Sequence, residues 1–557
     1  MQIVSQGILF RWLIPESSPP QTSEEFLQRL APPAALSNPR EFFHPSLLDD
    51  PVCDLAKCVG KELFSKTPGR VLISADYDVD GATSAAIMGR ALTLLGWQVR
   101  TFIPSRFVDN YGINYNRLTE AYEQEPYEYI VAVDCGATEM RGLSEFAKSK
   151  GISVTVIDHH KRGPEGEGVL EANPHLCLTD GAMEGGYSAA ILAALMVYFC
   201  RESHPALSSL VLHSEVLAGL SAIADSASML SPAARYYAKT LLSPDSRKHY
   251  GSGLRALFDF SRVKDGGSTS DIAFKIVPVL NAAGRLHSAE IILGLLLETD
   301  PSRAESVVQK LVVLNKRRRS IQEEVQREAL SHYRKGDPVL IATHKKWHAG
   351  VVGPAAGQIA EQLGIPVFLG GFLPQRGVFS FSGRTGNDTD IYDLMARSVN
   401  DLPAFFGGHK VALGLKISEG DIECLPALRT NLIANAPDLP PRVTPVALCI
   451  TPKDVNPENF AAISHYEPFG VDNPAPLFCL KDVSVQFDVI PNLANSLSGT
   501  ARDSDGNGVT VFSFRNARFF HIRKFSGSIV GEMSLMNDGD SKKSVFIARD
   551  FIPRSSH

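Results

Sequence analysis

Residues 71–84 read Val71-Leu72-Ile73-Ser74-Ala75-Asp76-Tyr77-Asp78-Val79-Asp80-Gly81-Ala82-Thr83-Ser84, an apolar run followed by three carboxylates at alternate positions and a glycine. The apolar run predicts a strand, the acids with Gly81 predict a tight turn, and residues 82–95 predict a helix. The acids therefore lie at the carboxyl end of a strand, the edge where open α/β sheets bind ligands. Three such acids repel one another unless cations neutralise them, and Mg²⁺ or Mn²⁺ accepts carboxylate oxygens.

Two other interpretations fit this stretch taken alone. One is a solvated turn that happens to be rich in aspartate. The other is a calcium loop, since the spacing of the three acids and the glycine resembles the start of one. The twelfth position of such a loop carries Glu, however, and here it is Ile87.

The residues that follow repeat the same strand and helix pattern. Strands are predicted at 71–75, 98–103, 129–133 and 152–157, and helices at 82–95, 116–124 and 139–149. This βαβ repetition implies a mainly parallel sheet with right-handed crossovers, so the fold class is α/β.

Further acids and two histidines stand at the ends of these strands. Because the ends of parallel strands lie along one edge, we expect one cleft to hold Asp76, Asp78, Asp80, Asp134, Asp158, His159 and His160. A lone histidine is more often a core residue, but imidazole beside several carboxylates favours a divalent metal, with Mn²⁺ preferred over Mg²⁺. Asp225, at the end of the apolar stretch 217–224, could complete the set.

The bulk composition is that of a globular protein with several domains. Of 557 residues, 44% are hydrophobic and 21% charged, and the net charge of −6 means that nucleic-acid binding must come from local clusters. The eight cysteines form no CxxC pair, which predicts neither a zinc ribbon nor a disulfide framework and fits a reducing cytoplasm. No signal pattern is evident at the N-terminus, and the longest apolar stretch, 186–200, is too short to span a bilayer and predicts a buried helix.

The remaining sequence predicts four further segments around the first domain at 51–299. Residues 1–50 predict a semi-extended N-terminal arm leading into that domain, 300–336 a long connecting helix, 337–430 a smaller α/β domain and 431–557 a β domain with short alternating strands. The helix carries the run Lys316-Arg317-Arg318-Arg319, for which two interpretations stay open. It is either a solvated face or the lining of a groove for a nucleic-acid backbone.

Four segments resemble, in order and spacing, the four motifs of the DHH phosphoesterases: Asp76–Gly81, Asp134–Gly136, Asp158–His160 and Ala224-Asp225. The resemblance extends to the RecJ family of bacterial single-strand-specific exonucleases through the segments 103–112 and 278–286. The segments 347–353, 382–384 and 407–409 resemble motifs of that family's second domain, DHHA1. The family usually has Gly where Ala75 stands, and 495–500 replaces its usual His-Leu-Lys strand. The resemblance implies a parallel-sheet DHH domain, a long helix, a smaller α/β DHHA1 domain and a C-terminal OB-like β-barrel.

The resemblance also implies roles for individual residues. Asp78 and Asp134 would hold one cation, and Asp80, Asp134, His159 and Asp225 a second, with Asp134 shared. Asp76 would be a ligand or its outer partner, Asp158 would orient His159, and His160 would contact the scissile phosphate. A 5′-phosphate pocket would consist of Arg106, Arg285, His348, Ser382, Arg384, Gly407, Gly408 and His409.

The function implied is a metal-dependent 5′→3′ exonuclease that hydrolyses single-stranded DNA to mononucleotides in repair and recombination. Its cofactors would be two divalent cations, Mn²⁺ preferred or Mg²⁺. The expected partners are single-stranded DNA, a single-strand-binding protein and a helicase; no membrane is expected, and the chain would act as a monomer in the cytoplasm. One alternative is a DHH phosphodiesterase acting on short oligoribonucleotides, cyclic dinucleotides or pyrophosphate. The other is a non-catalytic single-strand-binding scaffold, which the acids at every metal position disfavour.

Overall fold

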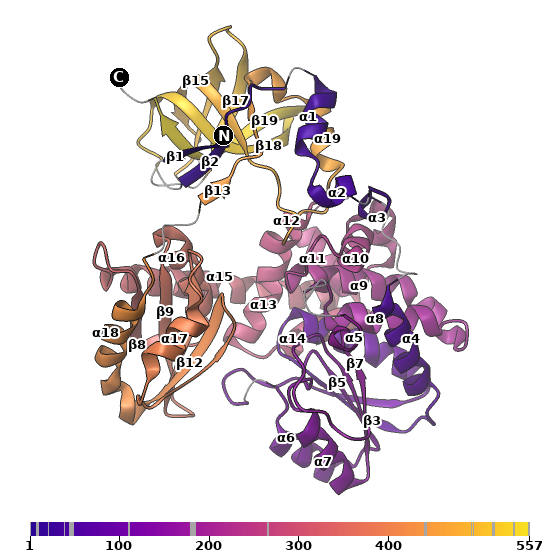
Figure 1. The fold of residues 1–557 in the computed structure, drawn as a ribbon. Helices are drawn as coiled ribbons and strands as arrows, with labels where there is room; N and C mark the ends of the chain where they lie inside the picture. The colour runs from indigo at the N-terminus through magenta and orange to yellow at the C-terminus, as the bar shows by residue number, and fades with distance from the viewer. Residues whose placement is uncertain are drawn as a thin grey trace.

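A computed structural model gives the fold of the chain in three units (Figure 1). It describes all residues except 1, 7–10, 21, 38, 44–49, 110–111, 179–184, 264–266, 439–442, 492, 494, 515–518, 539–540 and 555–557. A large unit with a parallel sheet lies beside a smaller α/β unit, and a β-barrel lies above both; the long helix α15 (Pro301–Ser331) joins the first two. Asn110 and Tyr111 of the family-like segment 103–112 lie outside the described residues.

The sheet of the large unit is parallel throughout and brings the acidic strand ends into line. Its strands, in spatial order, are β4 (Gln98–Phe102), β3 (Arg70–Ala75), β5 (Tyr129–Val133), β6 (Ser153–Ile157) and β7 (Val169–Ala172). Ala75 pairs with Val133 and Val133 with Ile157, so β3, β5 and β6 end level with one another. The next residue after each of these strands is an aspartate.

Helix α5 (Val79–Leu94) follows β3 after a very short turn. It begins three residues before the predicted start, because the Asp78 carboxylate accepts the backbone N–H groups of Asp80 and Gly81 at 2.9 and 3.2 Å. The turn requires glycine at position 81, since a Cβ there would lie 2.3 Å from the Asp76 carbonyl oxygen. The acids therefore sit on a sharp strand-to-helix connection.

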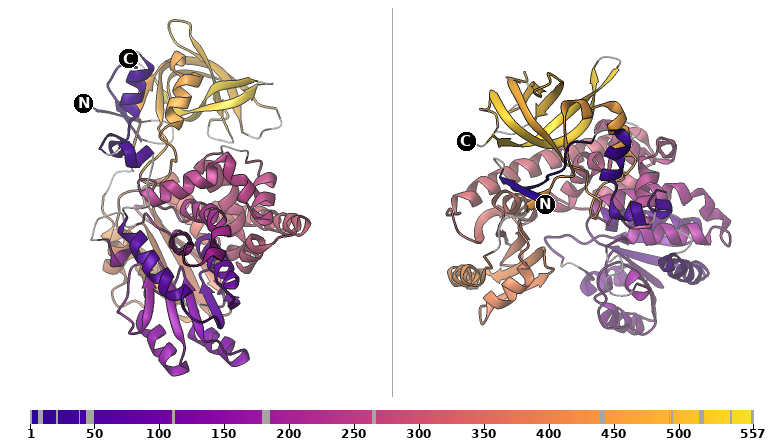
Figure 2. Two further views of the ribbon diagram at one scale, coloured as in Figure 1. Left: turned by 90° about the vertical axis from the view of Figure 1, so that its right-hand side faces the viewer. Right: turned by 45° about the horizontal axis from the view of Figure 1, so that its top comes forward.

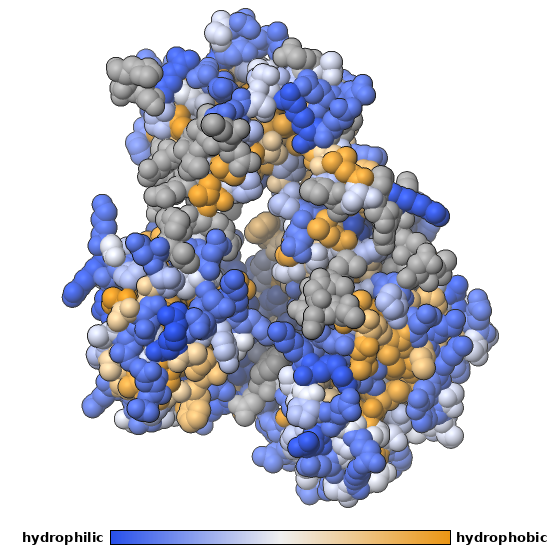
Figure 3. All heavy atoms as spheres, in the orientation of Figure 1, coloured by the Kyte–Doolittle hydropathy of each residue, from blue (hydrophilic) through white to orange (hydrophobic). Residues whose placement is uncertain are grey.

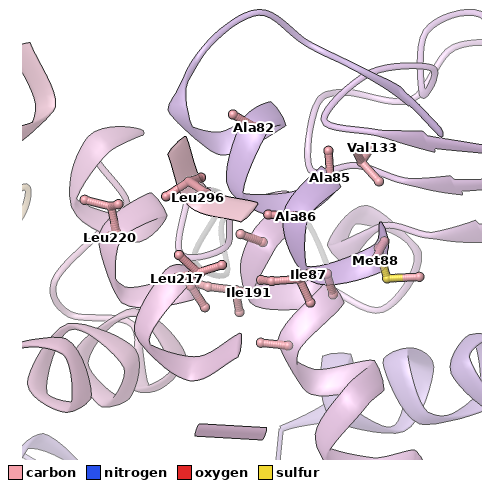
Figure 4. Packing of buried hydrophobic residues seen from close by; sticks show 14 of the residues in the cluster. Ala82, Ala85, Ala86, Ile87, Met88, Val133, Ile191, Leu217, Leu220 and Leu296 are labelled. Carbon is pink, nitrogen blue, oxygen red and sulfur yellow. The ribbon is translucent and has the colours of Figure 1, made fainter. Parts of the chain in front are cut away.

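The core of this unit lies between α5 and two further helices. Figure 4 shows Ala86 and Ile87 of α5 close to Ile191 of α8 (Ala189–Cys200) and Leu217 of α9 (Val211–Ala224). Helix α8 is apolar on nearly all sides and almost wholly buried, which confirms the buried helix predicted at 186–200. Helices α6 (Tyr115–Gln124) and α7 (Met140–Lys150) pack on the opposite face of the sheet. No helix in the described part of the chain is long and apolar enough to cross a bilayer.

The connecting helix forms where the sequence predicts it. Asp300 accepts the Arg303 N–H at 2.8 Å and Pro301 occupies the first helical position. Helix α15 packs against α13 (Val277–Leu286) of the large unit and α16 (Val352–Leu363) of the small one. It thereby spans the two units (Figure 2).

The small unit is a mixed sheet flanked by helices. Its strands, in spatial order, are β11 (Ala404–Gly408), β12 (Ala412–Ser418), β10 (Val378–Thr385), β9 (Pro366–Leu373) and β8 (Leu340–His348), of which β8 and β9 are parallel. Helix α16 packs on one face, and α17 (Ile391–Val399) with α18 (Leu425–Asn435) packs on the other. The sequence did not predict the β11–β12 hairpin as strands.

The C-terminal unit is a closed barrel, as the sequence suggests. Its wall runs β15 (Phe478–Val489), β16 (Leu497–Arg502), β17 (Gly508–Ser513), β19 (Ser541–Pro553) and β18 (Lys524–Asp538), and β18 returns to pair with β15. The segment 495–500, which departs from the family pattern, still provides most of strand β16.

The described part of residues 1–50, predicted as a semi-extended arm leading into the first domain, forms strands and short helices that pack on the barrel and on α10 (Pro232–Leu242) of the large unit. Strands β1 (Gln2–Gln6) and β2 (Arg11–Pro15) form a hairpin that pairs with β13 (Val443–Pro445). The buried Trp12 indole N–H donates to Asp550 at 2.8 Å, and Phe26 stacks on Phe478 in the barrel core. Apolar burial therefore brings the two ends of the chain together.

Candidate metal centre and phosphate pocket

All eight predicted catalytic residues lie in one cluster at the carboxyl edge of the parallel sheet. Their ligand atoms fall into three sets, each within 4.8 Å: Asp76, Asp78 and Asp134; Asp80, His159 and Asp225; and Asp134, Asp158, His159 and His160. Because Asp134 and His159 each belong to two sets, the three sets form one continuous group. Carboxylates at strand ends provide most of the atoms, as predicted.

Asp134 occupies the centre of the cluster in a strained conformation. Its φ of 58° lies in the left-handed region, which costs a residue other than glycine roughly 1–3 kcal/mol. Its side chain is buried, and Oδ1 lies 3.4 Å from His159 Nε2 and 3.9 Å from His160 Nδ1. A strained residue held at a cluster of acids is typical of a functional site.

Asp80 is fixed by the N-terminus of α8. Its two carboxylate oxygens accept the N–H groups of Ala189 and Ala190 at 2.8 and 2.9 Å, and the Ser221 hydroxyl donates to it at 2.5 Å. A helix N-terminus stabilises a buried negative charge, so the fold sets the orientation of this carboxylate. Ser221 belongs to no motif, so no sequence pattern predicts this contact.

His159 faces three carboxylates without a hydrogen bond from its Nε2. The distances are 3.4 Å to Asp134 Oδ1, 3.5 Å to Asp225 Oδ2 and 3.7 Å to Asp80 Oδ2. Among the described residues, Nε2 is buried and unpartnered. Burial lowers the pKa of His159, which favours the neutral imidazole that coordinates metals.

Three acids of this cluster, Asp76, Asp134 and Asp225, resist ionisation. Burial, followed by the neighbouring Asp78, raises the pKa of Asp76, while burial and Asp80 raise the pKa of Asp134 and of Asp225. Asp76 Oδ1 is also buried without a hydrogen-bond partner in the described part of the chain. Carboxylate oxygens, a neutral imidazole and like charges that repel one another fit divalent cations.

Asp158 contacts the ring of His160, whereas the sequence analysis assigned it to the ring of His159. Its Oδ1 lies 2.8 Å from His160 Nδ1, whereas its contact with His159 is to the backbone N–H, at 2.7 Å, and not to the ring. Burial opposes the charge on Asp158, but the His160 contact, the charges of both imidazoles and the Ala137 N–H hold its pKa at about 2. Burial likewise opposes the charge on His160, but Asp158 raises the pKa of His160 to about 9.

Four guanidinium groups gather beside the acids. Burial and the charges of Arg106, Arg318 and Arg384 lower the pKa of Arg285 to about 9. Arg285 donates to the Gly350 carbonyl at 3.3 Å, and Arg106 Nε is buried without a partner among the described residues. Such a concentration of positive charge fits a phosphate group.

Tyr77 connects the arginines with the acids. It stands between Asp76 and Asp78 in the chain, and the Arg106 guanidinium lies over its ring, 4.3 Å from the centroid. The charge of Arg106 also acts on Asp76. It favours a lower pKa of Asp76, but burial and the charge of Asp78 are stronger and raise that pKa overall. The arginine group and the acid cluster are therefore neighbours.

The small unit provides the other wall of this pocket. A Cβ at Gly353, at the start of α16, would lie 3.1 Å from the Ser382 hydroxyl and 3.8 Å from Arg384 Nη2. The His348 ring packs edge-on against Phe107 of the large unit, 5.2 Å between centroids. Between the two units the space-filling view shows a hollow bordered by hydrophilic residues (Figure 3).

The predicted glycine-histidine turn lies farther from this pocket. Gly407 pairs with Gly414, and Gly414 pairs with Ser382, so Gly407 is two strands away from the serine. At about 4.8 Å per strand this separation is about 10 Å. Gly408 has a φ of 144°, and His409 is exposed in the β11–β12 turn. Within the described residues, the structure thus groups Arg106, Arg285, His348, Ser382 and Arg384, with Gly407, Gly408 and His409 at the periphery.

Two residues that the sequence analysis did not assign join this pocket. Arg318 donates to Asn315 and Gln322 on its own helix and adds its charge to the arginine group. Arg317 lies close enough to His348 to help burial lower the pKa of that histidine. Arg317 and Arg318 of the basic run on α15 therefore lie beside the arginine group, which favours the groove interpretation over a purely solvated face.

Known protein families match each unit in turn. Residues 70–220 match the DHH family, N-terminal domain, residues 336–435 the DHHA1 domain and residues 446–543 the RecJ OB domain. The single-stranded-DNA-specific exonuclease RecJ of Thermus thermophilus is 31% identical over 417 residues, which are 74% of this chain and 59% of the relative. The RecJ of Bacillus subtilis is 27% identical over 496 residues, 86% of this chain and 61% of the relative. The chain thus spans about three-fifths of the length of these relatives.

Solved structures agree with the sequence matches. A crystal structure of RecJ in complex with Mn²⁺ from T. thermophilus has a TM-score of 0.78 at 26% identity and covers 96% of this chain and 76% of that one. A structure of exonuclease RecJ bound to manganese is 31% identical, with a TM-score of 0.57, over 70% of this chain and 95% of that one. The three domains occur in the predicted order, and the motifs meet in one cluster. The chain therefore belongs to the RecJ family of DHH phosphoesterases.

Proposed function

We propose that the chain is a metal-dependent 5′→3′ exonuclease that hydrolyses single-stranded DNA from its 5′ end to mononucleotides, in DNA repair and recombination. The observation that carries this proposal is the adjacency of the acid cluster and the arginine cluster on the two sides of Tyr77. The T. thermophilus and B. subtilis relatives are named single-stranded-DNA-specific exonucleases, which supports the exonuclease reaction and the single-stranded-DNA substrate.

The proposed metal ligands divide around Asp134. Asp78 and Asp134 would hold one cation, and Asp80, Asp134, His159 and Asp225 the other, with Mn²⁺ preferred and Mg²⁺ as the alternative. Two such cations neutralise a scissile phosphodiester and lower the pKa of water. The unpartnered His159 Nε2 supports this assignment, and the unpartnered Asp76 Oδ1 supports Asp76 as a further ligand or outer partner, because both are buried atoms with a lone pair to donate.

The other residues of the cluster position the substrate. Asp158 fixes the His160 ring through Nδ1, which supports a contact between His160 and the scissile phosphate. Arg106, Arg285, Ser382 and Arg384 would bind the 5′-phosphate, with His348 at their side and Gly407, Gly408 and His409 along the outer wall. A 5′ end held one nucleotide away from the metals would release mononucleotides.

The direct test uses a single-stranded oligonucleotide labelled at either end, incubated with the protein and Mn²⁺. We expect the 5′ label to appear at once as a mononucleotide, while the 3′ label appears in a ladder of shortening strands. Circular single-stranded DNA should stay intact. Early release of the 3′ label, or cleavage of the circle, would contradict the proposal.

The phosphate pocket has a test of its own. A bidentate guanidinium matches phosphate better than a point charge does, so Arg384→Lys should lose part, and Arg384→Ala most, of the preference for 5′-phosphorylated over 5′-hydroxyl ends. The ratio of the two rates is measured within each variant, which cancels any general loss of activity. Equal losses on both ends would exclude Arg384 as the reader of the terminal phosphate.

We also propose that single-stranded DNA is delivered by a single-strand-binding protein and a helicase, and that the chain works as a cytoplasmic monomer. All eight cysteines are unpaired, which is consistent with a reducing compartment. Sedimentation of the protein at several concentrations tests the monomeric state, and pull-down with each purified partner tests the delivery.

A further inference from the structure

A second cavity lies at the other end of α5 from the acids. Its volume is about 600 Å³, and it is bounded by the last turns of α5, the edge strand β4, the start of α9 and the turn at Gly251. Arg90 is ten residues after Asp80 on α5, about 15 Å along the helix. The cavity is thus separate from the proposed catalytic cleft.

Arg90 brings a positive charge into this cavity without an acidic partner. Its guanidinium is half-buried and donates to the Leu296 carbonyl at 3.2 Å. Among the described residues no carboxylate forms an ion pair with it. A guanidinium carries five N–H donors, so most of its hydrogen-bonding capacity remains for an anion.

His213, which lines the same space, carries an unpartnered acceptor within the described part of the chain. Its side chain is 9% exposed, and Nδ1 lies 3.2 Å from the His249 carbonyl oxygen. Because a carbonyl only accepts, Nδ1 carries the proton, which leaves a lone pair on Nε2. Nε2 is buried and has no partner in the described part of the chain.

The start of helix α11 (Ser252–Phe260) completes the polar end of the cavity. Its N-cap is Gly251, so no side chain caps the first N–H groups. A Cβ built at Gly251 would lie 3.4 Å from His213 Cε1 and 4.0 Å from Arg90 Nη2, which places the uncapped helix end between the two side chains. The rest of the lining combines an apolar part, with Leu94, Val99, Leu210 and Leu297, and a polar part, with Thr93, Thr101, Ser209 and His249.

We propose that this cavity binds a phosphate monoester that carries an apolar or aromatic group. The phosphate oxygens would accept from Arg90 and the first N–H groups of α11, and one proton shared between the phosphate and His213 Nε2 would form the third contact. A carboxylate lacks that proton, and inorganic phosphate leaves the apolar lining uncovered. The chemistry fits a nucleoside monophosphate, and this inference does not depend on the proposed nuclease function.

The test titrates dAMP into the full-length Arg384→Ala variant, in EDTA, by isothermal calorimetry. The background substitution weakens the phosphate pocket of the cleft, so that binding reports on the second cavity. We expect one site per chain, with inorganic phosphate and deoxyadenosine each at least about tenfold weaker than dAMP. Absence of dAMP binding, or equal binding of inorganic phosphate, would overturn the proposal.

Further substitutions locate the site. Arg90→Met should weaken dAMP binding at least about tenfold. Gly251→Val should do the same while leaving every charge in place, because the backbone at 251 (φ −61°, ψ 163°) suits any residue and its side chain would enter the cavity. Arg255→Met, which removes an exposed charge from the same helix, is the matched control and should change nothing. Unchanged dAMP binding in folded Arg90→Met and Gly251→Val proteins would contradict the proposal. Nuclease rates of Arg90→Met and Gly251→Val in the wild-type background are measured separately, because they test the proposed nuclease function and not the second cavity.

Discussion

The residues of the acid cluster differ in the hydrogen bonds that fix their side chains. Asp80 is fixed by Ala189, Ala190 and Ser221, and Asp158 by backbone N–H groups and His160. Asp76 Oδ1 and His159 Nε2, in contrast, are buried without partners among the described residues. The fold thus orients part of the cluster and leaves donor atoms directed toward one shared space, which is the arrangement a metal site requires.

Asp134→Asn tests the central position of this cluster. The amide keeps the size of the side chain but removes the charge that two cations would share, so we expect hydrolysis to fall by more than about a hundredfold, about 2.7 kcal/mol of barrier. Rates on end-labelled oligonucleotide measure the effect, and circular dichroism checks the fold. Glu165→Gln, at an exposed acid outside the cluster, is the control. A variant within about tenfold of the wild-type rate would show that Asp134 is not shared.

The buried His213, in the cavity distant from the acids, should make the stability of the protein depend on pH. Burial, then the charge of Arg90, lowers the pKa of His213 to about 4, whereas a histidine in an unfolded chain titrates near 6.5. Between these values only the unfolded state takes up the proton, so the free energy of unfolding falls as the pH decreases from about 6.5 to about 4, by about 3 kcal/mol in total. Urea unfolding of wild type and His213→Gln at neutral and acidic pH measures this. An identical pH dependence in both proteins would be inconsistent with a neutral buried His213.

Among the elements, the strands and helices around the acids follow from the sequence because their apolar periodicity is local. The predicted strands at 71–75 and 129–133 lie within one residue of β3 and β5. Helix α5 starts earlier than predicted because Asp78 serves as both N-cap and candidate ligand, and periodicity does not reveal a cap. Strand β16 was missed because its serine, glycine and threonine residues give no apolar signal.

Helix α15 is the element whose role the sequence left open. Since Arg317 lies beside His348 and Arg318 joins the arginine group, we expect this helix to contact the DNA backbone. Arg317→Ala should weaken binding of single strands of any sequence and reduce the slope of log affinity against log salt by about 1. Fluorescence anisotropy at several salt concentrations measures it.

The control for this prediction is Arg303→Ala, at the far end of the same helix, where the arginine pairs with Glu298. It should leave both affinity and salt slope unchanged. If the two variants behave alike, α15 is only a spacer between the two units.

For the whole molecule, the sequence predicts the order of the units but not how the chain ends meet. Trp12 and Asp550 are 538 residues apart and form a buried hydrogen bond, and no local pattern encodes such a pairing. The same limit applies to the cleft, since Arg285, Gly353 and Ser382 converge only through packing of α13, α15 and α16. For these residues the family motifs, and not the periodicity, carried the prediction.

The barrel should matter most for long substrates. Phe512 and Phe514 are stacked, 5.3 Å between centroids, beside a groove lined by Gln486, Thr500 and Thr510. Stacking of a base on an aromatic ring is worth roughly 1–3 kcal/mol, so Phe514→Ala should weaken binding of a long single strand by about tenfold. Binding of a short strand that reaches only the cleft should not change. Phe260→Ala, at an exposed aromatic of the large unit, is the control, and equal loss for both strand lengths would contradict a DNA track on the barrel.

The measurement that tests the metal centre most directly is anomalous diffraction at the manganese edge from crystals of the protein grown with Mn²⁺. Two cations should appear at the carboxyl edge of β3, β5 and β6, roughly 3.5–4 Å apart, with Asp134 in contact with both. Crystals of Asp134→Asn should lose at least one of the two peaks. A single peak in the wild-type crystals, or two peaks of which only one contacts Asp134, would contradict the shared-ligand centre on which the proposed activity rests.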